Sequence, residues 1–283
     1  MADYVGNARK GLAIYFAVLI SLTGLLEWLL LRTGDSITDH AGLVFLLMWT
    51  PAIASIGARL ILREGIRDVS LKLQGAFGWK PLSIGWLYPV AVGLIAYGLA
   101  WLTGLATFSA AGMSFIGSIV INLTVGVLFS GTATAGEEIG WRGYMLMRLF
   151  NAKIPRPVLI SGVIWGLWHL PLILSGQYAS GPNPTVSAVI FMAAILPTTY
   201  LVSWLRLQSG SVWPPIIFHA SWNSLIQGVF DQSTKETSIW LGESGIVVAL
   251  VSLVLTVCLV RGRWSIKRTP SEEMANQVSA MTV

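Results

Sequence analysis

Long apolar runs alternate with short polar or basic connections along the whole chain. Eight of these runs hold about 19 or more residues, and at about 1.5 Å per residue each can cross the roughly 30 Å hydrocarbon core of a bilayer. The pattern predicts an all-α polytopic membrane protein, a bundle of about eight transmembrane helices. The predicted spans are residues 12–31, 42–62, 84–106, 115–146, 157–175, 185–205, 212–230 and 241–260.

Two of the predicted spans need interpretation. Residues 115–146 form either one long tilted helix or a helix broken around Gly131–Gly136, so the limits of this fourth span stay open. Residues 12–31 lack a small-residue cleavage site and run on into further leucines. We therefore interpret them as a retained span and not as a removed signal peptide.

Composition extends the membrane interpretation to the whole chain. The chain has 54% hydrophobic residues, a mean hydropathy of +0.71 and 13 tryptophans. A soluble domain of this composition would not stay in solution. We therefore expect one transmembrane domain over residues 1–283, with a tail at 269–283 that lacks apolar periodicity and is expected to be disordered. The single cysteine, Cys258, has no cysteine partner, so disulfides play no part.

Basic residues favour one side of the predicted bundle. An even number of spans puts both termini on one side, and sixteen of the 18 Lys and Arg residues share that side, with Arg32 and Lys235 on the other. Cytoplasmic connections carry the excess of Lys and Arg, so both termini are predicted to be cytoplasmic, in an integral protein of a bacterial cytoplasmic membrane. This orientation explains the net charge of +5 without a bound nucleic acid. The expected partner of the basic residues is the lipid bilayer.

The segment GEEIGWRGYM, residues 136–145, places two carboxylates and an arginine in the fourth span. An ionised side chain at mid-bilayer costs roughly 2.5–3.5 kcal/mol, so Glu137 and Glu138 need compensation. Glu138 and Arg142 are four residues apart and share a helix face, whereas Glu137 lies about 100° around the helix. We predict that Arg142 neutralises Glu138 and leaves Glu137 as the reactive carboxylate. A solvated charge cluster at the cytoplasmic interface is the alternative.

Two of the three histidines lie inside predicted spans, in the segments WGLWHLP and FHASWN. Trp165 precedes His169 by four residues and His219 precedes Asn223 by four, so each pair shares a helix face. A lone histidine in a span is usually a satisfied bundle residue. Two histidines, an asparagine and an unpaired glutamate in one apolar chain instead predict a shared polar pocket.

A polar pocket inside the bilayer has to admit water from one side of the membrane. Arg142, Arg148 and Lys153 follow the two glutamates on the predicted cytoplasmic side. We therefore expect the bundle to enclose a polar cavity that opens toward the cytoplasm.

These residues resemble the motifs of a family of intramembrane proteases, the CAAX prenyl endopeptidase and bacteriocin-processing family, also called CPBP or Abi. Its pattern is Glu-Glu-x-x-x-Arg, then an aromatic residue four positions before a His, then His-x-x-x-Asn or Asp. Each motif alone is weak, but their order and spacing in an eight-span chain are specific. The resemblance covers a protease-like core at about residues 115–230, with Trp165 where Phe is commoner in the family.

The resemblance implies an intramembrane endopeptidase in which a glutamate, helped by a histidine, activates a water to attack a peptide carbonyl. Another histidine and an asparagine would stabilise the oxyanion. The matching catalytic positions are Glu137 and His169 for the water and His219 and Asn223 for the oxyanion, and the supporting positions are Glu138, Arg142 and Trp165. The implied substrate is a membrane-associated or lipidated peptide or protein, and whether it is prenylated stays open.

Three alternatives stay open at this point. Glu137, His169 and His219 are a plausible zinc set, although the chain has no His-Glu-x-x-His helix and the resemblance favours a mechanism without a cofactor. The same cavity would also suit a non-proteolytic immunity or regulatory membrane protein that binds a peptide or partner. Finally, carboxylates and histidines inside a membrane can form the proton relay of a proton-coupled transporter.

Overall fold

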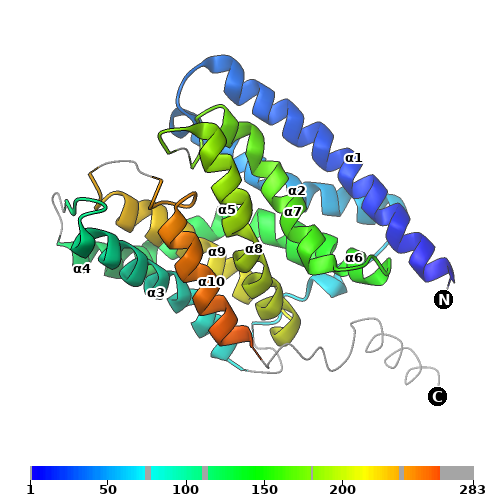
Figure 1. The fold of residues 1–283 in the computed structure, drawn as a ribbon. Coiled ribbons are helices and arrows are strands. Elements are labelled where there is room, and N and C mark those ends of the chain that lie inside the picture. Colours follow the sequence, from blue (N-terminus) through cyan, green and yellow to red (C-terminus); the bar gives the residue numbers. More distant parts are fainter. Residues whose placement is uncertain (1, 74–77, 110–113, 180, 236–238, 262–283) are drawn as a thin grey trace.

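The computed structural model describes residues 2–73, 78–109, 114–179, 181–235 and 239–261, which fold into a bundle of helices (Figure 1). Within these ranges, eight uninterrupted helical runs correspond to the eight predicted spans. Five runs are single helices, namely α1 (Ala2–Thr33), α3 (Lys80–Thr103), α7 (Pro157–Leu174), α8 (Pro184–Ser209) and α10 (Ile246–Val260). The predicted tail, 269–283, lies outside the described residues.

The other three runs are composite. The short 3₁₀ helix η1 (Ile37–His40) leads into α2 (Ala41–Leu62), and a further short helix, η2 (Arg67–Val69), lies in the connection that follows. The fourth run joins α4 (Phe115–Ile121), η3 (Asn122–Gly126), α5 (Val127–Gly140), η4 (Trp141–Met145) and α6 (Leu146–Asn151). The seventh joins α9 (Trp213–Trp222) and η5 (Asn223–Asp231). The segments η3, η4 and η5 are π-helical.

Six helices within the described ranges are long and apolar enough to cross a membrane by length and composition. They are Tyr4–Thr33, Ile37–Leu62, Lys80–Thr103, Phe115–Asn151, Pro157–Leu174 and Pro184–Ser209. A seventh, α10, is apolar but only 15 residues long, and the run of α9 and η5 carries the polar residues of the predicted pocket. The prediction of an all-α polytopic membrane protein is confirmed.

The fourth run is one continuous helix and is not broken at Gly131–Gly136. Its glycines instead allow α2 to pack closely along α5. A Cβ atom added at Gly136 would lie 2.8 Å from the Met48 carbonyl oxygen, and one at Gly140 would collide with Pro51. Close backbone approach through small residues is a usual way to pack helices in a bilayer, where lipid tails are as apolar as leucine.

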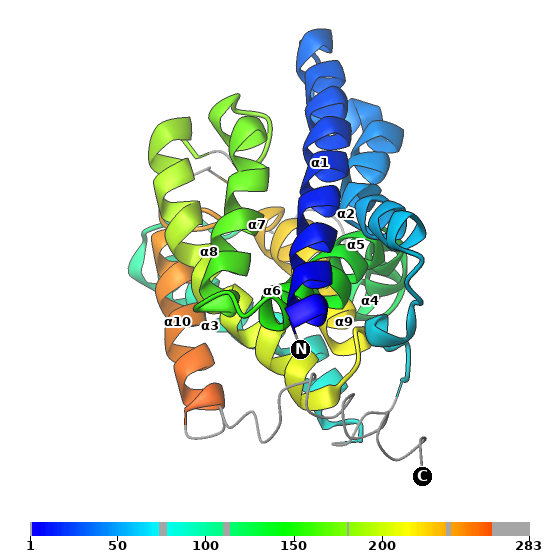
Figure 2. The ribbon, with the colours of Figure 1, turned by 90° about the vertical axis from the view of Figure 1, so that its right-hand side faces the viewer.

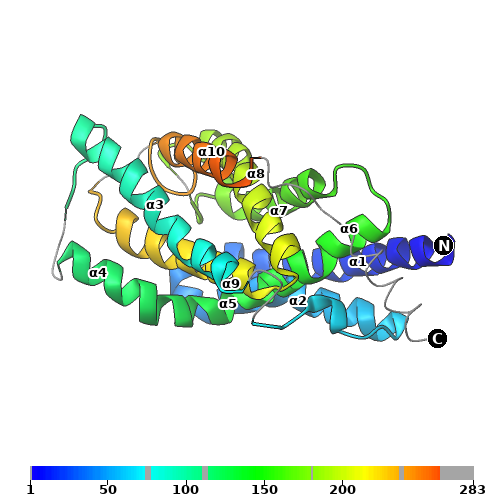
Figure 3. The ribbon, with the colours of Figure 1, turned by 90° about the horizontal axis from the view of Figure 1, so that it is seen from below.

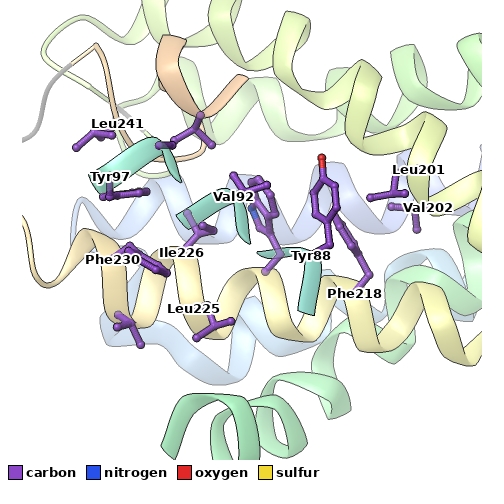
Figure 4. Packing of buried hydrophobic residues seen from close by; sticks show 14 of the residues in the cluster. Tyr88, Val92, Tyr97, Leu201, Val202, Phe218, Leu225, Ile226, Phe230 and Leu241 are labelled. Atoms are coloured by element: carbon purple, nitrogen blue, oxygen red, sulfur yellow. The ribbon is translucent and has the colours of Figure 1, made fainter. Parts of the chain in front are cut away.

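Helix α9 lies at the centre of the bundle, where it packs against α3, α5 and α8 (Figure 3). Its apolar side joins α3 and α8 in the largest hydrophobic cluster (Figure 4). Tyr88 of α3 lies 5.6 Å from Phe218 between ring centroids, and Tyr97 lies 5.1 Å from Phe230. Because α9 is fixed on this side by aromatic packing, its opposite side holds polar residues at a defined position.

The two ends of the bundle differ in charge. The end that contains the start of α1 and the connections α2–α3, α6–α7 and α8–α9 is called the basic end, and the other is called the open end. Figure 2 shows the α1–α2 and α7–α8 connections at the top and the start of α1 at the bottom.

At the basic end, Asp68 joins three helical runs through arginines. It accepts hydrogen bonds from Arg59 Nη1 at 2.5 Å and from Arg148 Nη1 at 3.0 Å, while Arg206 Nη2 donates to its backbone carbonyl at 2.7 Å. Arg148 also pairs with Glu64 at 2.6 Å. This network ties the α2–α3 connection to α2, α6 and α8, so the basic end is closed by ion pairs.

Candidate active site

The site is built around the middle of the fourth run, at the junction of α5 and η4. Glu138 and Arg142 are both fully buried and form an ion pair, with Nη1 2.9 Å from Oε1. The same carboxylate oxygen lies 2.9 Å from Nδ1 of His219. The guanidinium of Arg142 also lies over the Trp165 ring, 4.0 Å from its centroid. Glu138 is therefore neutralised as predicted, and it also orients a histidine from α9.

Glu137 is 2% exposed and has different neighbours. Its Oε2 accepts hydrogen bonds from the indole nitrogens of Trp165, at 3.0 Å, and Trp141, at 3.3 Å. Among the described residues, Glu137 forms no ion pair, and its Oε1 accepts no hydrogen bond. Two indoles therefore fix the carboxylate and leave one oxygen available to the cavity that it lines.

Hydrogen bonds fix the tautomer of His169. Its Nδ1 lies 2.8 Å from the backbone carbonyl oxygen of Trp165. A carbonyl oxygen can only accept, so Nδ1 carries the proton and Nε2 of the neutral ring keeps its lone pair. The ring is held by Trp168, Tyr178 and Phe191, at 4.8, 5.5 and 5.0 Å between centroids.

The π-helical segments lie next to site residues. η4 begins at Trp141, directly after the α5 turn that carries both glutamates, and η5 begins at Asn223. A π-helical turn shifts the register of the side chains that follow, and such turns are frequent at functional sites. η5 is in addition fastened to η3, because Ser224 Oγ donates to the Asn122 carbonyl at 3.0 Å.

The structure brings the four predicted catalytic residues to one cavity of about 780 Å³, lined by Glu137, His169, His219 and Asn223 among others. Glu137, His169 and His219 are buried, whereas Asn223 is half-buried. Of the supporting residues, Glu138 and Arg142 lie behind the cavity wall, and Trp165 belongs to a smaller adjoining cavity.

The cavity opens at the open end of the bundle. Its outer lining comes from the connections α1–α2, α7–α8 and η5–α10, with Thr38, Gln232 and Lys235 exposed. The expectation that it opens on the side of Arg148 and Lys153 is wrong. On that side the ion-pair network and buried side chains of η4 fill the space between the helices.

Sequence reasoning missed a second polar group in the same cavity. The Tyr178 hydroxyl and Trp222 Nε1 both donate hydrogen bonds to the carboxylate of Glu243, the latter at 2.7 Å. Burial and the neighbouring Glu243 raise the pKa of the Tyr178 phenol well above its ordinary value, so Tyr178 stays a donor. Tyr178 lies between the predicted spans 157–175 and 185–205, and Glu243 lies at the start of the predicted span 241–260 but precedes α10 in the structure, so no local signal pointed to them.

The zinc alternative can be tested against this geometry. Within the described part of the chain, no three His, Cys, Asp or Glu side chains are grouped so that they could hold a metal ion. Glu137, His169 and His219 therefore do not fit a zinc site as they stand.

Comparison with known proteins agrees with the motif pattern. Residues 116–225 match the family described as Type II CAAX prenyl endopeptidase Rce1-like. The CAAX prenyl protease 2 of Methanococcus maripaludis is 34% identical over 92 residues, which cover 31% of this chain and 34% of that protein. The chain thus spans about a third of the length of this curated relative. With the motif residues on one cavity, these matches show that residues 116–225 of this integral membrane protein are similar to the CAAX prenyl endopeptidase and bacteriocin-processing family.

Proposed function

We propose that the chain is an intramembrane endopeptidase that hydrolyses a peptide bond with a water activated by Glu137 and His169. The observation that carries the proposal is the division of the two adjacent glutamates. Glu138 is bound to an arginine and a histidine, whereas Glu137 keeps one oxygen toward the cavity. The family match and the relative named CAAX prenyl protease 2 support a peptidase.

In the first step, a water lies between Glu137 Oε1 and His169 Nε2, both of which can accept its protons. Glu137 removes one proton as the water oxygen attacks the carbonyl carbon of the peptide bond. A positioned base of this kind contributes typically about 10²–10⁴-fold to a rate. Because both groups are fixed by hydrogen bonds to indoles or backbone, little reorganisation accompanies the proton transfer.

In the second step, the negative charge on the carbonyl oxygen needs donors. The amide of Asn223 is one, and Nε2–H of a protonated His219 is the other. The Glu138 carboxylate stabilises the imidazolium through Nδ1. Glu137 then passes its proton to the amide nitrogen, the C–N bond breaks, and the products are a carboxylic acid and an amine. Both glutamates thus act, one on the water and one on the oxyanion donor.

The test is cleavage by purified protein in proteoliposomes, with a pool of fluorescence-quenched peptides and mass spectrometry of the products. We expect Glu137→Gln to lower the cleavage rate by about 10²–10⁴-fold with an unchanged unfolding temperature. Glu64→Gln is the matched control, since Glu64 pairs with Arg148 at the basic end, away from the cavity. Equal cleavage by Glu137→Gln would overturn the mechanism, and peptide binding by wild type without any cleavage would favour the non-proteolytic alternative.

A further inference from the structure

We propose that the cavity receives its peptide from the non-cytoplasmic side of the membrane. Given the peptidase activity proposed above, the substrate class is a peptide segment exposed at the outer surface, including the outer flank of a membrane-spanning segment. Two features of the molecule carry this inference independently of the reaction, namely the charge at the two ends of the bundle and the end at which the cavity opens.

The first feature is the distribution of lysine and arginine in the folded chain. The open end has Arg32, at the last turn of α1, and Lys235, after η5. The basic end or the helical turns next to it carry Arg9, Lys10, Arg59, Arg63, Lys72, Lys80, Arg148, Lys153, Arg156, Arg206 and Arg261. Short connections rich in Lys and Arg stay in the cytoplasm, so this bias orients the basic end inward.

The second feature is the depth profile of the cavity. Its mouth, with exposed Gln232 and Lys235, belongs to the connection between η5 and α10. Its floor holds Glu137 and His219, which are 2% and 7% exposed. Beyond this floor toward the basic end come Trp141, Arg142, Tyr144 and Met145, all fully buried. A peptide at the basic end would have to displace this packed layer, whereas one at the open end meets a formed cavity.

The chemistry of the mouth suits a peptide backbone. Gln177 and Gln227 line the cavity, and Gln177 already accepts a hydrogen bond from the backbone of Ile37 at 3.2 Å through its oxygen, which leaves its NH₂ group as a donor. Phe45 and Met48 of α2 provide an apolar wall on another side. Neutral amides can hydrogen-bond the backbone of an extended chain while the apolar wall contacts its hydrophobic side.

The side of the membrane on which the cavity opens can be measured without a cleavage assay. Cys258 is the single cysteine of the chain, so Cys258→Ser gives a background in which one new cysteine reports its own location. In that background, Gln232→Cys marks the mouth, and Leu73→Cys, 56% exposed in the α2–α3 connection, marks the basic end. A membrane-impermeant maleimide should label Gln232→Cys at least about 10-fold faster in right-side-out than in inside-out vesicles, and Leu73→Cys in the reverse order. The opposite pattern would overturn the inference.

A second measurement separates this inference from the proposed function. Impermeant fluorescence-quenched peptides are added outside vesicles of either orientation, and Glu137→Gln gives the background. We expect cleavage in right-side-out vesicles alone. Cleavage in inside-out vesicles would overturn the outward access and keep the peptidase. Outward labelling of Gln232→Cys without cleavage in either orientation would keep the access side and overturn the peptidase.

Discussion

At the basic end of the bundle, half-buried carboxylates form ion pairs with arginines, whereas at the cavity floor the carboxylate of Glu137 forms no ion pair among the described residues. Asp68 contacts Arg59 and Arg148 through ion pairs of 2.5 and 3.0 Å. Glu137, in contrast, is held by indole N–H groups. If Glu137 is the base that we propose, burial of charge alone does not mark a reactive group in a membrane protein. The distinguishing property is a fixed carboxylate with a free oxygen toward a cavity.

We expect the largest loss of stability from a substitution that removes the ion pair between Glu138 and Arg142 behind the cavity. Arg142→Ala would leave Glu138 fully buried without its cation and remove the guanidinium from the Trp165 ring. Removing one partner of a buried pair typically costs about 3–5 kcal/mol. We expect a large drop in the unfolding temperature and in the yield of folded protein, measured by size-exclusion chromatography and thermal unfolding in detergent.

Arg148→Ala at the basic end is the variant to compare with Arg142→Ala. Its partners Glu64 and Asp68 have side chains that are 24% and 16% exposed, so water can solvate them when the arginine is lost. We expect a destabilisation nearer to about 1 kcal/mol per ion pair. An equal loss of stability in both variants would contradict the distinction between the two regions.

The next effect concerns the oxyanion. His219→Gln removes the Nδ1 hydrogen bond to Glu138 and the donor proposed for the transition state. One such donor is worth about 10²–10³-fold in kcat. His40→Gln, in the η1 turn beside Asp35, is the matched control and should cleave peptides like the wild type. A kcat for His219→Gln within about threefold of wild type would remove His219 from the proposed mechanism.

Most of the fold was predictable because a bilayer leaves few choices. Backbone groups in hydrocarbon must bond within the segment, so each apolar run had to be helical. The continuity of the fourth run was not predictable. Whether Gly136 and Gly140 break the helix or allow close packing depends on α2, which packs against them from a distant part of the sequence. The side on which the cavity opens depends likewise on which end the side chains fill.

The candidate site was predictable where helical spacing determines contacts. The pair of Glu138 and Arg142 and the approach of His169 to the Trp165 carbonyl both follow from positions four residues apart. The bond of His219 to Glu138 joins positions 81 residues apart. Spacing along one helix carries no information on such a contact, since it depends on how α9 packs against α5.

A smaller loss of stability is expected at the basic end when Asp68 loses its charge. Asp68→Asn keeps the shape of the side chain but removes the charge that faces Arg59 and Arg148. We expect a loss of about 1–2 kcal/mol in unfolding free energy, as hydrogen bonds to charged groups become neutral ones. Cleavage by the folded fraction should be unchanged, since Asp68 lies outside the cavity. A fall in kcat without a fall in stability would connect the network to catalysis.

The smallest expected change concerns the two indoles that hold Glu137, the proposed base. Trp165→Phe keeps an aromatic ring against Arg142 but removes the shorter of the two hydrogen bonds to Glu137, at 3.0 Å, and leaves that of Trp141, at 3.3 Å. Phenylalanine is also the commoner residue at the matching position of the family that the motifs resemble, so we expect correct folding and a kcat lowered by less than about 10-fold, the equivalent of about 1.4 kcal/mol.

Trp213→Phe supplies the matched change at the basic end, where the indole donates to the Leu71 carbonyl at 2.9 Å. It should leave kcat unchanged, because no reacting group depends on that bond. If both substitutions leave kcat unchanged, the remaining Trp141 bond is sufficient to fix Glu137. If Trp165→Phe instead abolishes cleavage, the carboxylate depends on both donors, and members of the family with phenylalanine here must fix the glutamate by another contact.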